Sequence, residues 1–340
     1  MGNRANNKLL LAAVGAGAFF AARALFRQVN AYSFRDRVVL ITGGSRGLGL
    51  LIARELAREG ARLAICARDE GELQRAQAEL SQSAEVIAIP CDVGDRRQVE
   101  AFVEAAEQHF GHIDLLINNA GTISVGPMDV MTVEDYEHAM RVHFWGPLNA
   151  TLAVLPEMKR RGEGRIVNVS SIGGKISVPH LLPYSASKFA LVGLSEGLRA
   201  ELAKDGIVVT TVCPGLMRTG SPRNANFKGQ NEAEYAWFKI SDSLPLTAIN
   251  ARRAARQIVE AARRGDAEVV LTVQAKAAAL FHGVFPGLTA DLLGLVNQLL
   301  PESGGIGIAR EKGRQSESAW SRSWLTALTD RAAEENNQIH

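Results

Sequence analysis

The chain has 340 residues, of which 46% are hydrophobic and 22% are charged, and its formal net charge is +2. This length is enough for one large or two small domains with a substantial buried core. A nearly neutral chain has no concentrated basic face, so the composition argues against nucleic acid as a partner.

The first segment with a clear character is "KLLLAAVGAGAFFAARALF", residues 8–26, which is apolar from Leu9 to Ala22 and is interrupted by Arg23. A membrane-spanning helix needs about 20 apolar residues. Three interpretations stay open: a signal-anchor helix, a helix lying in the membrane interface, and a cleaved signal peptide. More arginines follow the segment than precede it. We therefore predict an N-terminal anchor over residues 1–34 and a membrane-associated main domain that faces the cytoplasm.

Residues 35–275 alternate between strand-like and helix-like segments. Seven short, β-branched runs are apolar on both faces, as strands of a buried parallel sheet are. The segments between them have helical spacing and end at glycine. This alternation predicts an α/β fold with a doubly wound, parallel, seven-stranded sheet of the Rossmann type and helices on both faces. The predicted strands are 37–42, 61–66, 85–90, 113–118, 164–170, 207–212 and 267–272.

Residues 276–340 form a C-terminal segment of different character. Leucine and valine recur at helical spacing over 288–300, residues 301–318 have the composition of a flexible polar linker, and residues 320–332 form a weak amphipathic helix. Two interpretations remain for this segment. It is a tail that is disordered or packs against the domain edge, or it makes a second contact with a membrane.

The three cysteines, Cys66, Cys91 and Cys213, lie in or beside apolar runs. An odd number in such settings indicates small buried hydrophobic residues in a reducing compartment. The chain contains neither a CxxC motif nor a His/Cys cluster, so we predict no metal site.

A glycine-rich stretch, "TGGSRGLG" (42–49), follows the first predicted strand and opens the first helix. Gly43, Gly47 and Gly49 permit a tight turn and let the backbone approach a pyrophosphate at the helix N-terminus. Alone, such a stretch is also consistent with an ordinary turn. Its position at the first strand-to-helix crossing favours a dinucleotide site.

The charges near this turn favour NADP(H) over NAD. NAD sites place an acid at the end of the second strand, whereas this chain has Ala67 there and Arg68 just after it. Arg46 adds a cation within the turn. Each arginine alone would be a solvated surface charge, but together they suit a 2′-phosphate because guanidinium groups bind phosphate oxygens bidentately.

Tyr184 and Lys188 lie four positions apart and so share one helix face. A tyrosine with its ordinary pKa of about 10 is a poor acid–base group at neutral pH, and a nearby ammonium would lower that pKa. A core tyrosine beside a snorkelling lysine is the simpler interpretation of an isolated pair. Here the pair is not isolated, because Ser171 lies thirteen residues before Tyr184, at the end of the fifth strand. We expect its hydroxyl and the phenol to lie at the carboxyl edge of the sheet, where ligands bind in this architecture.

Two further motifs, "NNAG" (118–121) and "CPGLMRT" (213–219), end the fourth and sixth predicted strands. With these motifs in order, residues Phe34 to Leu271 resemble the single-domain branch of the short-chain dehydrogenase/reductase family. The resemblance implies hydride transfer between a nicotinamide and a carbonyl or alcohol. It implies Tyr184 as the general acid, Lys188 as the residue that lowers its pKa and holds the nicotinamide ribose, and Ser171 as the hydroxyl that orients the carbonyl.

The resemblance also implies a set of cofactor-binding residues along the sheet edge. Asp92 matches the position that contacts the adenine, and the loop after the sixth strand matches the one that contacts nicotinamide. The full expected set is Gly43, Ser45, Arg46, Gly47, Leu48, Gly49, Arg68, Asp92, Val93, Asn119, Ala120, Gly121, Tyr184, Lys188, Pro214, Gly215 and Thr219.

One position departs from the family pattern. His143 stands where the family has an asparagine that bends the helix and holds a water behind the lysine. A histidine can donate and accept hydrogen bonds and can pass protons itself, so we include His143 among the catalytic candidates. The alternative is that it only fills the helix kink.

Apolar and aromatic residues in 172–183 and 217–245 predict a lipophilic carbonyl or alcohol substrate of steroid, retinoid, long-chain acyl or sphingoid type. The layout resembles that of membrane-attached hydroxysteroid and retinol dehydrogenases. The resemblance implies a homodimer or homotetramer formed through the helices that carry His143 and Tyr184. Two alternatives are a non-catalytic NADP(H)-binding membrane sensor and a nucleotide-sugar epimerase or dehydratase.

Overall fold

The computed structural model describes residues 32–244, 248–323 and 326–339. Two compact units divide the chain at Ser33 and Phe34, and the larger one contains Phe34–His340. The predicted N-terminal anchor falls almost entirely on residues outside the described ones. Within the described ranges, every helix is too short or too polar to cross a membrane.

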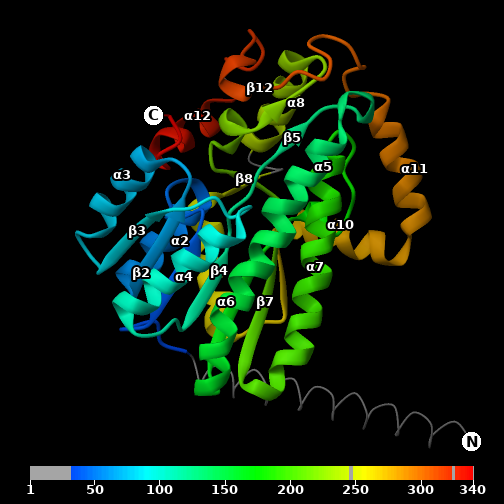
Figure 1. Cartoon of the computed structure of the whole chain (residues 1–340). Helices are drawn as coiled ribbons and strands as arrows, with labels where there is room; N and C mark the ends of the chain where they lie inside the picture. Colours follow the sequence, from blue (N-terminus) through cyan, green and yellow to red (C-terminus); the bar gives the residue numbers. More distant parts are fainter. Residues whose placement is uncertain (1–31, 245–247, 324–325, 340) are drawn as a thin grey trace, which may run out of the picture. The chain divides into compact units, whose positions relative to one another are not determined.

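The larger unit is built on one parallel sheet of seven strands, which confirms the predicted fold class (Figure 1). The strand order is β3-β2-β1-β4-β6-β7-β11, and it reverses beside β1, between β1 and β4. All five residues of β1 are buried, as the apolar pattern on both faces requires. The strands are β1 (Val38–Thr42), β2 (Arg62–Ala67), β3 (Val86–Pro90), β4 (Leu115–Asn118), β6 (Gly164–Val169), β7 (Ile207–Pro214) and β11 (Glu268–Leu271).

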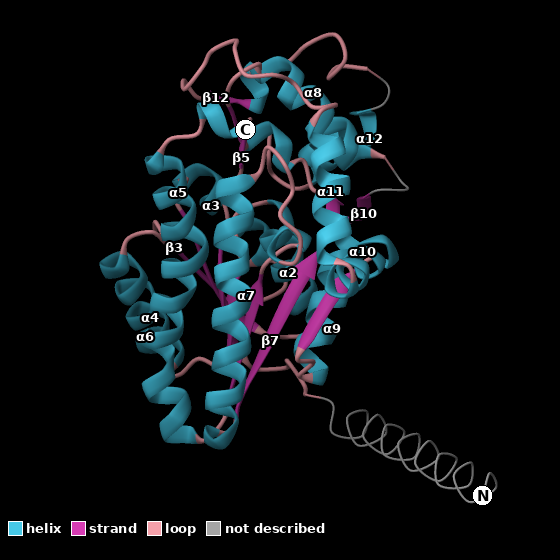
Figure 2. Ribbon diagram, turned by 90° about the vertical axis from the view of Figure 1, so that its right-hand side faces the viewer, coloured by secondary structure: helices cyan, strands magenta, loops and turns pink. Residues whose placement is uncertain are grey.

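Helices cover both faces of the sheet (Figure 2). On one side α2 packs against α9, and on the other α4 packs against α6. The chain forms α2 (Gly47–Arg58), α3 (Glu70–Leu80), α4 (Arg96–Phe110), α5 (Val133–Met140), α6 (Gly146–Arg161), α7 (Leu182–Leu202), α8 (Asn231–Ser243) and α9 (Ala251–Arg264). Cys66, Cys91 and Cys213 are buried free thiols, as predicted.

A π-helical turn, Arg141–Trp145, joins α5 to α6 and carries His143. Such turns bulge a helix locally and are frequent at functional sites. Short 3-10 turns lie at Met128–Val130, Ile172–Gly174, Ala203–Asp205, Ser221–Asn224 and Gly313–Gln315.

Short strands above the carboxyl edge of the sheet tie in the C-terminal segment. β12 (Glu311–Lys312) pairs with β9 (Asn226–Phe227), which pairs with β5 (Ser124–Val125), while β8 (Leu216–Arg218) pairs with β10 (Ala248–Asn250). The prediction of a flexible linker over 301–318 is therefore wrong. Main-chain pairing holds this segment, and a polar, glycine-rich composition does not reveal such pairing.

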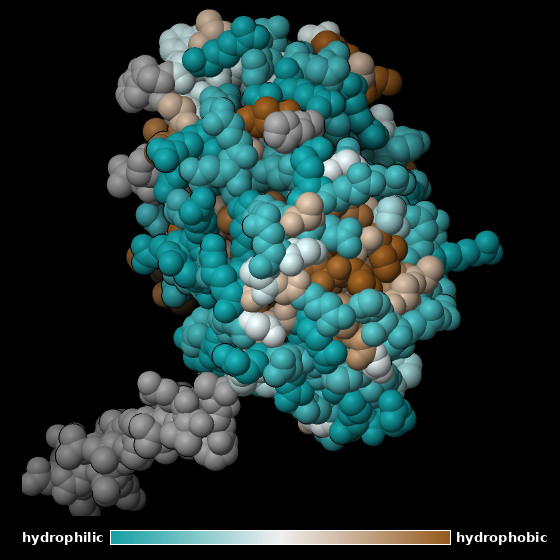
Figure 3. All heavy atoms as spheres, turned by 90° about the vertical axis from the view of Figure 1, so that its left-hand side faces the viewer, coloured by the Kyte–Doolittle hydropathy of each residue, from teal (hydrophilic) through white to brown (hydrophobic). Residues whose placement is uncertain are grey.

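Two helices after β11, α10 (Val273–Val284) and α11 (Pro286–Asn297), contact each other at the side of the unit seen in Figures 1 and 2. We call them the apolar hairpin, because their large hydrophobic side chains are exposed rather than packed on the domain edge. The face on the opposite side, shown in Figure 3, is mostly hydrophilic, with hydrophobic side chains gathered near its middle and in smaller groups towards the top of the view. The exposed set in the hairpin comprises Val273, Leu280, Phe281, Val284, Phe285, Leu288, Leu292, Leu295 and Val296.

The last helix, α12 (Ala327–Glu335), contacts α8 and β8. It falls partly within the helix predicted over 320–332. In Figure 1 the end of the chain lies beside α3 and the start of α2. The C-terminal segment therefore returns to the carboxyl edge of the sheet.

Candidate functional site

The glycine-rich turn links β1 to α2 in a conformation that needs glycine. Gly43 and Gly47 have φ values of +67° and +56°, and a Cβ on Gly49 would lie 2.1 Å from the Gly43 carbonyl oxygen. Among the described residues no side chain caps α2, and its first turn holds no acid. The helix N-terminus can therefore receive an anion, so the turn fits a pyrophosphate.

Asn119 fixes the shape of this turn. Its side-chain amide donates to the carbonyls of Thr42 and Gly43, each at 3.1 Å, and its backbone N–H donates to Thr42 Oγ1 at 3.0 Å. Ala120 follows so closely that its Cα would lie 2.8 Å from a Cβ on Gly43. The structure thus brings "NNAG" against the glycine turn.

At the adenosine end of the edge, β2 ends at Ala67, without an acid. Arg46 is held by an ion pair of 2.6 Å with Glu72, a buried residue that also accepts a hydrogen bond from Ser45 Oγ at 3.3 Å. Burial, together with the charges of Arg68 and Arg46, lowers the pKa of Lys312. Both arginines therefore lie near enough to Lys312 to disfavour its charge, while its ammonium donates to the Asn224 carbonyl at 3.1 Å.

Sequence reasoning missed both Glu72 and Lys312. Glu72 lies in an ordinary helical pattern, and its burial depends on α3 packing beside the turn. Lys312 comes near the arginines because β12 pairs with β9. No local signal identifies either residue.

The remaining cofactor candidates also lie along this edge. Asp92 Oδ1 accepts a hydrogen bond from Gly94 N at 2.9 Å, which fixes the carboxylate, and a Cβ on Gly215 would lie 3.1 Å from Thr272 Oγ1. Thr219 is buried, and its carbonyl accepts hydrogen bonds from the C-terminal segment. Leu48 and Val93 are buried, Gly121 lies beside His143, and Pro214 ends β7.

The structure brings Ser171 and Tyr184 together across Gly173. A Cβ on Gly173 would lie 3.0 Å from Tyr184 Cε1 and 3.5 Å from Ser171 Oγ, so only glycine fits without a shift. The backbone N–H of Gly173 donates to Ser171 Oγ at 3.0 Å. That bond uses an acceptor position of the serine, and the serine hydroxyl also forms a hydrogen bond with Tyr184.

The ammonium of Lys188 lies over the ring of Tyr184. Its Nζ is 5.7 Å from the Tyr184 ring centroid and donates to the Val169 carbonyl at 2.8 Å. Burial lowers the pKa of Lys188 to about 8. The side chain therefore still carries its charge at pH 7.

The predicted lowering of the tyrosine pKa is wrong in this structure. Burial raises the pKa of Tyr184 to about 12, and the hydrogen bond with Ser171 opposes this rise without cancelling it. Tyr184 consequently holds its proton firmly at neutral pH.

His143 is buried, and both of its ring nitrogens have partners. Nε2 lies 3.1 Å from the backbone N–H of Thr122 and accepts from it, so the ring proton is on Nδ1, which donates to Ser187 Oγ at 2.8 Å. Burial, with a smaller contribution from Lys188, holds the pKa of His143 well below its ordinary value. The geometry favours the alternative in which His143 fills the π turn as a neutral hydrogen-bonding residue.

An apolar wall adjoins Tyr184. Phe227, Tyr235 and Phe238 belong to a buried cluster, and Tyr184 packs against this cluster together with the partly buried Ile123, Val178 and Trp237. The fully buried aromatics of 217–245 are core packing rather than an open lining for a substrate. Ile123 was not among the predicted pocket residues.

Two buried residues tie the pocket segments together and were not predicted. Glu234 accepts from Trp237 Nε1 at 2.6 Å and lies 2.7 Å from His180 Nδ1. His180 adopts a φ of +61°, which places its ring against α8. This contact fixes the position of residues 172–183 relative to α8.

Comparisons with known proteins identify the family of this chain. Residues 37–229 match the short chain dehydrogenase family. The chain is 38% identical over 245 residues to a Streptomyces violaceoruber protein named as a ketoacyl reductase of the granaticin polyketide synthase, covering 70% of this chain and 90% of that protein. It is 32% identical over 261 residues to mouse dehydrogenase/reductase SDR family member 7B, covering 75% and 79%.

Solved structures give the same result. A short chain dehydrogenase/reductase from Burkholderia phymatum in complex with NAD superposes with a TM-score of 0.69 at 27% identity, covering 76% of this chain and 96% of that one. Levodione reductase superposes with a TM-score of 0.61 at 29% identity, covering 72% and 99%. This chain belongs to the short-chain dehydrogenase/reductase family of oxidoreductases, whose fold binds a nicotinamide dinucleotide.

Proposed function

We propose that this protein is an NADP(H)-dependent oxidoreductase that interconverts the carbonyl and alcohol forms of a lipophilic substrate. The proposal rests on one observation: Ser171 and Lys188 both contact Tyr184, in a fold whose glycine turn fits a pyrophosphate. These groups share the carboxyl edge of the sheet, where ligands bind in this architecture.

In the reductive direction Tyr184 is the acid. Its raised pKa keeps the phenol protonated at neutral pH, so the group is ready to donate to a carbonyl oxygen. Ser171, whose hydroxyl bonds Tyr184 in this structure, would donate its proton to the same carbonyl oxygen and orient it. The bound dinucleotide supplies the hydride. Lys188 keeps its charge and favours the phenolate that remains after the proton has moved.

The preference for NADP(H) rests on charge. Arg46 and Arg68 adjoin the end of β2, where Ala67 leaves no acid to hold ribose hydroxyls, and Lys312 adds a third cation. The buried Glu72 neutralises part of this charge through its ion pair with Arg46. A 2′-phosphate that replaced Glu72 as the partner of Arg46 would gain a bidentate contact.

The lipophilic substrate is supported by the partly buried Ile123, Val178 and Trp237, which pack with Tyr184 against one apolar cluster. The apolar hairpin begins next to Gly215, at the same edge, and would receive a lipid surface there. The Streptomyces relative named as a ketoacyl reductase is consistent with a long-chain acyl carbonyl.

We further propose that residues 1–34 attach the protein to a membrane with the catalytic unit facing the cytoplasm. The arginines that follow the apolar run support this orientation. A homodimer or homotetramer through α6 and α7 is part of the same proposal, because both helices leave large apolar side chains exposed.

The test measures NADPH oxidation in the presence of a panel of steroid, retinoid and long-chain ketones. The decrease in NADPH absorbance reports the reaction. We expect turnover with NADPH to exceed turnover with NADH, and Tyr184→Phe to lower kcat by roughly 10²–10⁴-fold because the proton donor is lost. Tyr136→Phe on α5 is the matched control and should leave kcat unchanged.

Turnover of small hydroxy acids alone would reject the lipophilic substrate. A Tyr184→Phe variant as fast as the parent would reject the mechanism. NADPH binding without turnover of any carbonyl would favour the sensor interpretation instead.

A further inference from the structure

The C-terminal residues Asn336, Asn337 and Gln338 lie on the glycine-rich turn. The backbone N–H of Gly47, the first residue of α2, donates to the Asn336 carbonyl at 2.9 Å. This N–H belongs to the helix end that the site offers to an anion. The carbonyl therefore takes a donor that a pyrophosphate would use.

The next two side chains extend the contact across the site. Asn337 Nδ2 donates to the carbonyls of Ser45 at 2.9 Å and Glu72 at 3.1 Å. Gln338 Nε2 donates to the Thr219 carbonyl at 2.9 Å and would lie 2.8 Å from a Cβ on Gly47. The segment thus bridges the glycine turn and the loop after β7, which are the two sides of the proposed dinucleotide site.

We propose that residues 336–338 occupy the pyrophosphate position, so that dinucleotide binding requires this segment to leave. The inference rests on the proposed function, since it names the dinucleotide as the competitor. Its physical basis is that one N–H group cannot fully satisfy both a carbonyl and a phosphate oxygen.

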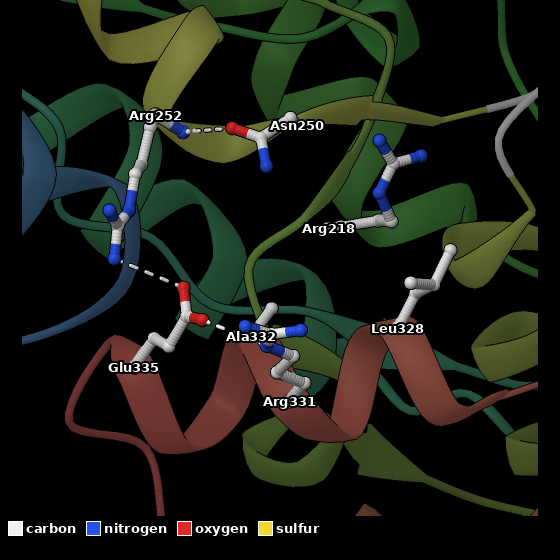
Figure 4. A pocket seen from close by; sticks show the side chains of 7 residues that line it. All are labelled: Arg218, Asn250, Arg252, Leu328, Arg331, Ala332 and Glu335. Carbon is white, nitrogen blue, oxygen red and sulfur yellow. Dashed lines mark hydrogen bonds and ion pairs between the residues drawn. The ribbon is translucent and has the colours of Figure 1, made fainter.

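The contacts around α12 are consistent with a segment that can move. Asn336 Oδ1 is buried and, within the part of the chain that the structure describes, has no hydrogen-bond partner, which is costly. A surface pocket of about 280 Å³ lies beside α12, lined by residues of β8, β10, the start of α9 and α12 itself. Figure 4 shows Glu335 at the end of α12 reaching Arg252 and Arg331 around this pocket.

One firm anchor sits farther back along the segment. Lys239 Nζ is buried on α8 and binds Asp330 Oδ1 at 2.8 Å and the Ser321 carbonyl at 2.8 Å. The beginning of α12 is therefore held while its end makes the contacts that compete with the dinucleotide. Release of residues 336–338 does not require the whole segment to unfold.

The test compares NADP⁺ affinity in the full chain and in the double variant Asn337→Gly, Gln338→Ala. Glycine keeps the φ of +56° at position 337 accessible, so the variant loses the side-chain contacts without backbone strain. If the closed form outnumbers the open form by about ten to one, opening it lowers the dissociation constant by up to about tenfold. Titration calorimetry measures this binding without any turnover.

The matched control is Asn297→Gly, Gln298→Ala at the exposed end of α11, which should leave the affinity unchanged. Hydrogen exchange of residues 327–339 in the parent chain is the second measurement, and NADP⁺ should accelerate it. Unchanged or weaker binding by the 337/338 variant, or slower exchange with NADP⁺, would overturn the inference. Failure of every variant to bind NADP⁺ would instead count against the proposed function.

Discussion

At the scale of single residues, the burial of Lys188 has a cost that depends on pH. Its pKa falls from 10.5 to about 8 in the folded chain, a difference of about 2.5 units or about 3 kcal/mol. Below pH 8 both the folded and unfolded states bind the proton, and the full cost is present. Between pH 8 and 10.5 the unfolded state alone keeps the proton, so the free energy of unfolding rises with pH.

Replacing this lysine should therefore stabilise the protein while removing activity. Lys188→Met removes the cost of about 3 kcal/mol and loses one hydrogen bond worth about 1 kcal/mol. We expect a gain of about 2 kcal/mol at pH 7 that shrinks steadily towards pH 10. Urea unfolding at several pH values measures it, with Lys276→Met on the exposed face of α10 as the control. A gain that did not vary with pH would contradict this account of the lysine.

The site shows which residue properties a sequence can reveal. The glycines at 43, 47 and 49 and the i, i+4 spacing of Tyr184 and Lys188 follow from local geometry, so their places were predictable. The pKa of Tyr184 was not, because it depends on burial. The partners of His143 also come from separate segments that only the fold brings together.

At the scale of elements, the sheet was predictable and the C-terminal segment was not. Each strand lies within one or two residues of its predicted range, because burial on both faces leaves a continuous apolar run. β12 has two residues and is held by main-chain bonds to β9, so its sequence has no pattern to read. The contact of residues 336–338 with Gly47 is likewise mostly polar and not local.

The apolar hairpin leads to a prediction about its environment. Each of its helices has 12 residues, about 18 Å, which is too short for a hydrocarbon core of about 30 Å but long enough to lie in an interface. We expect the side chain at position 292 to enter a lipid surface. Phosphatidylcholine vesicles, which carry no net charge, test apolar burial without electrostatic attraction.

The experiment uses a single environment-sensitive label. Because Cys66, Cys91 and Cys213 are buried, Leu292→Cys can be labelled selectively in the native chain. Vesicles should shift the emission of this label to the blue and leave unchanged a label at Gln82→Cys, on the exposed turn after α3. A shift that appears without vesicles and grows with protein concentration would mean that the hairpin covers another protein chain instead.

At the scale of the whole molecule, the Phe34–His340 unit has further exposed apolar side chains. These residues are distant in sequence from the apolar hairpin. Leu152 on α6 is 52% exposed, Phe189 on α7 is 40% exposed, and Trp145 in the π turn is 49% exposed. These belong to the helices through which we propose that copies of the chain associate. A stable interface buries about 800 Å² per partner and excludes unpaired charges from its centre.

A charge at Leu152 should therefore dissociate the oligomer. Burying an unpaired carboxylate costs at least about 2 kcal/mol, which weakens association about 30-fold or more. Sedimentation of Leu152→Glu should show a smaller species than the parent, while Leu292→Glu, an equal change on the hairpin, should sediment like the parent. If the Leu292 variant dissociates and the Leu152 variant does not, the hairpin is the interface and the proposed roles of the two surfaces are exchanged. The helix α7 also carries Tyr184 and Lys188. If association fixes the position of α7, dissociation of the oligomer lowers kcat as well.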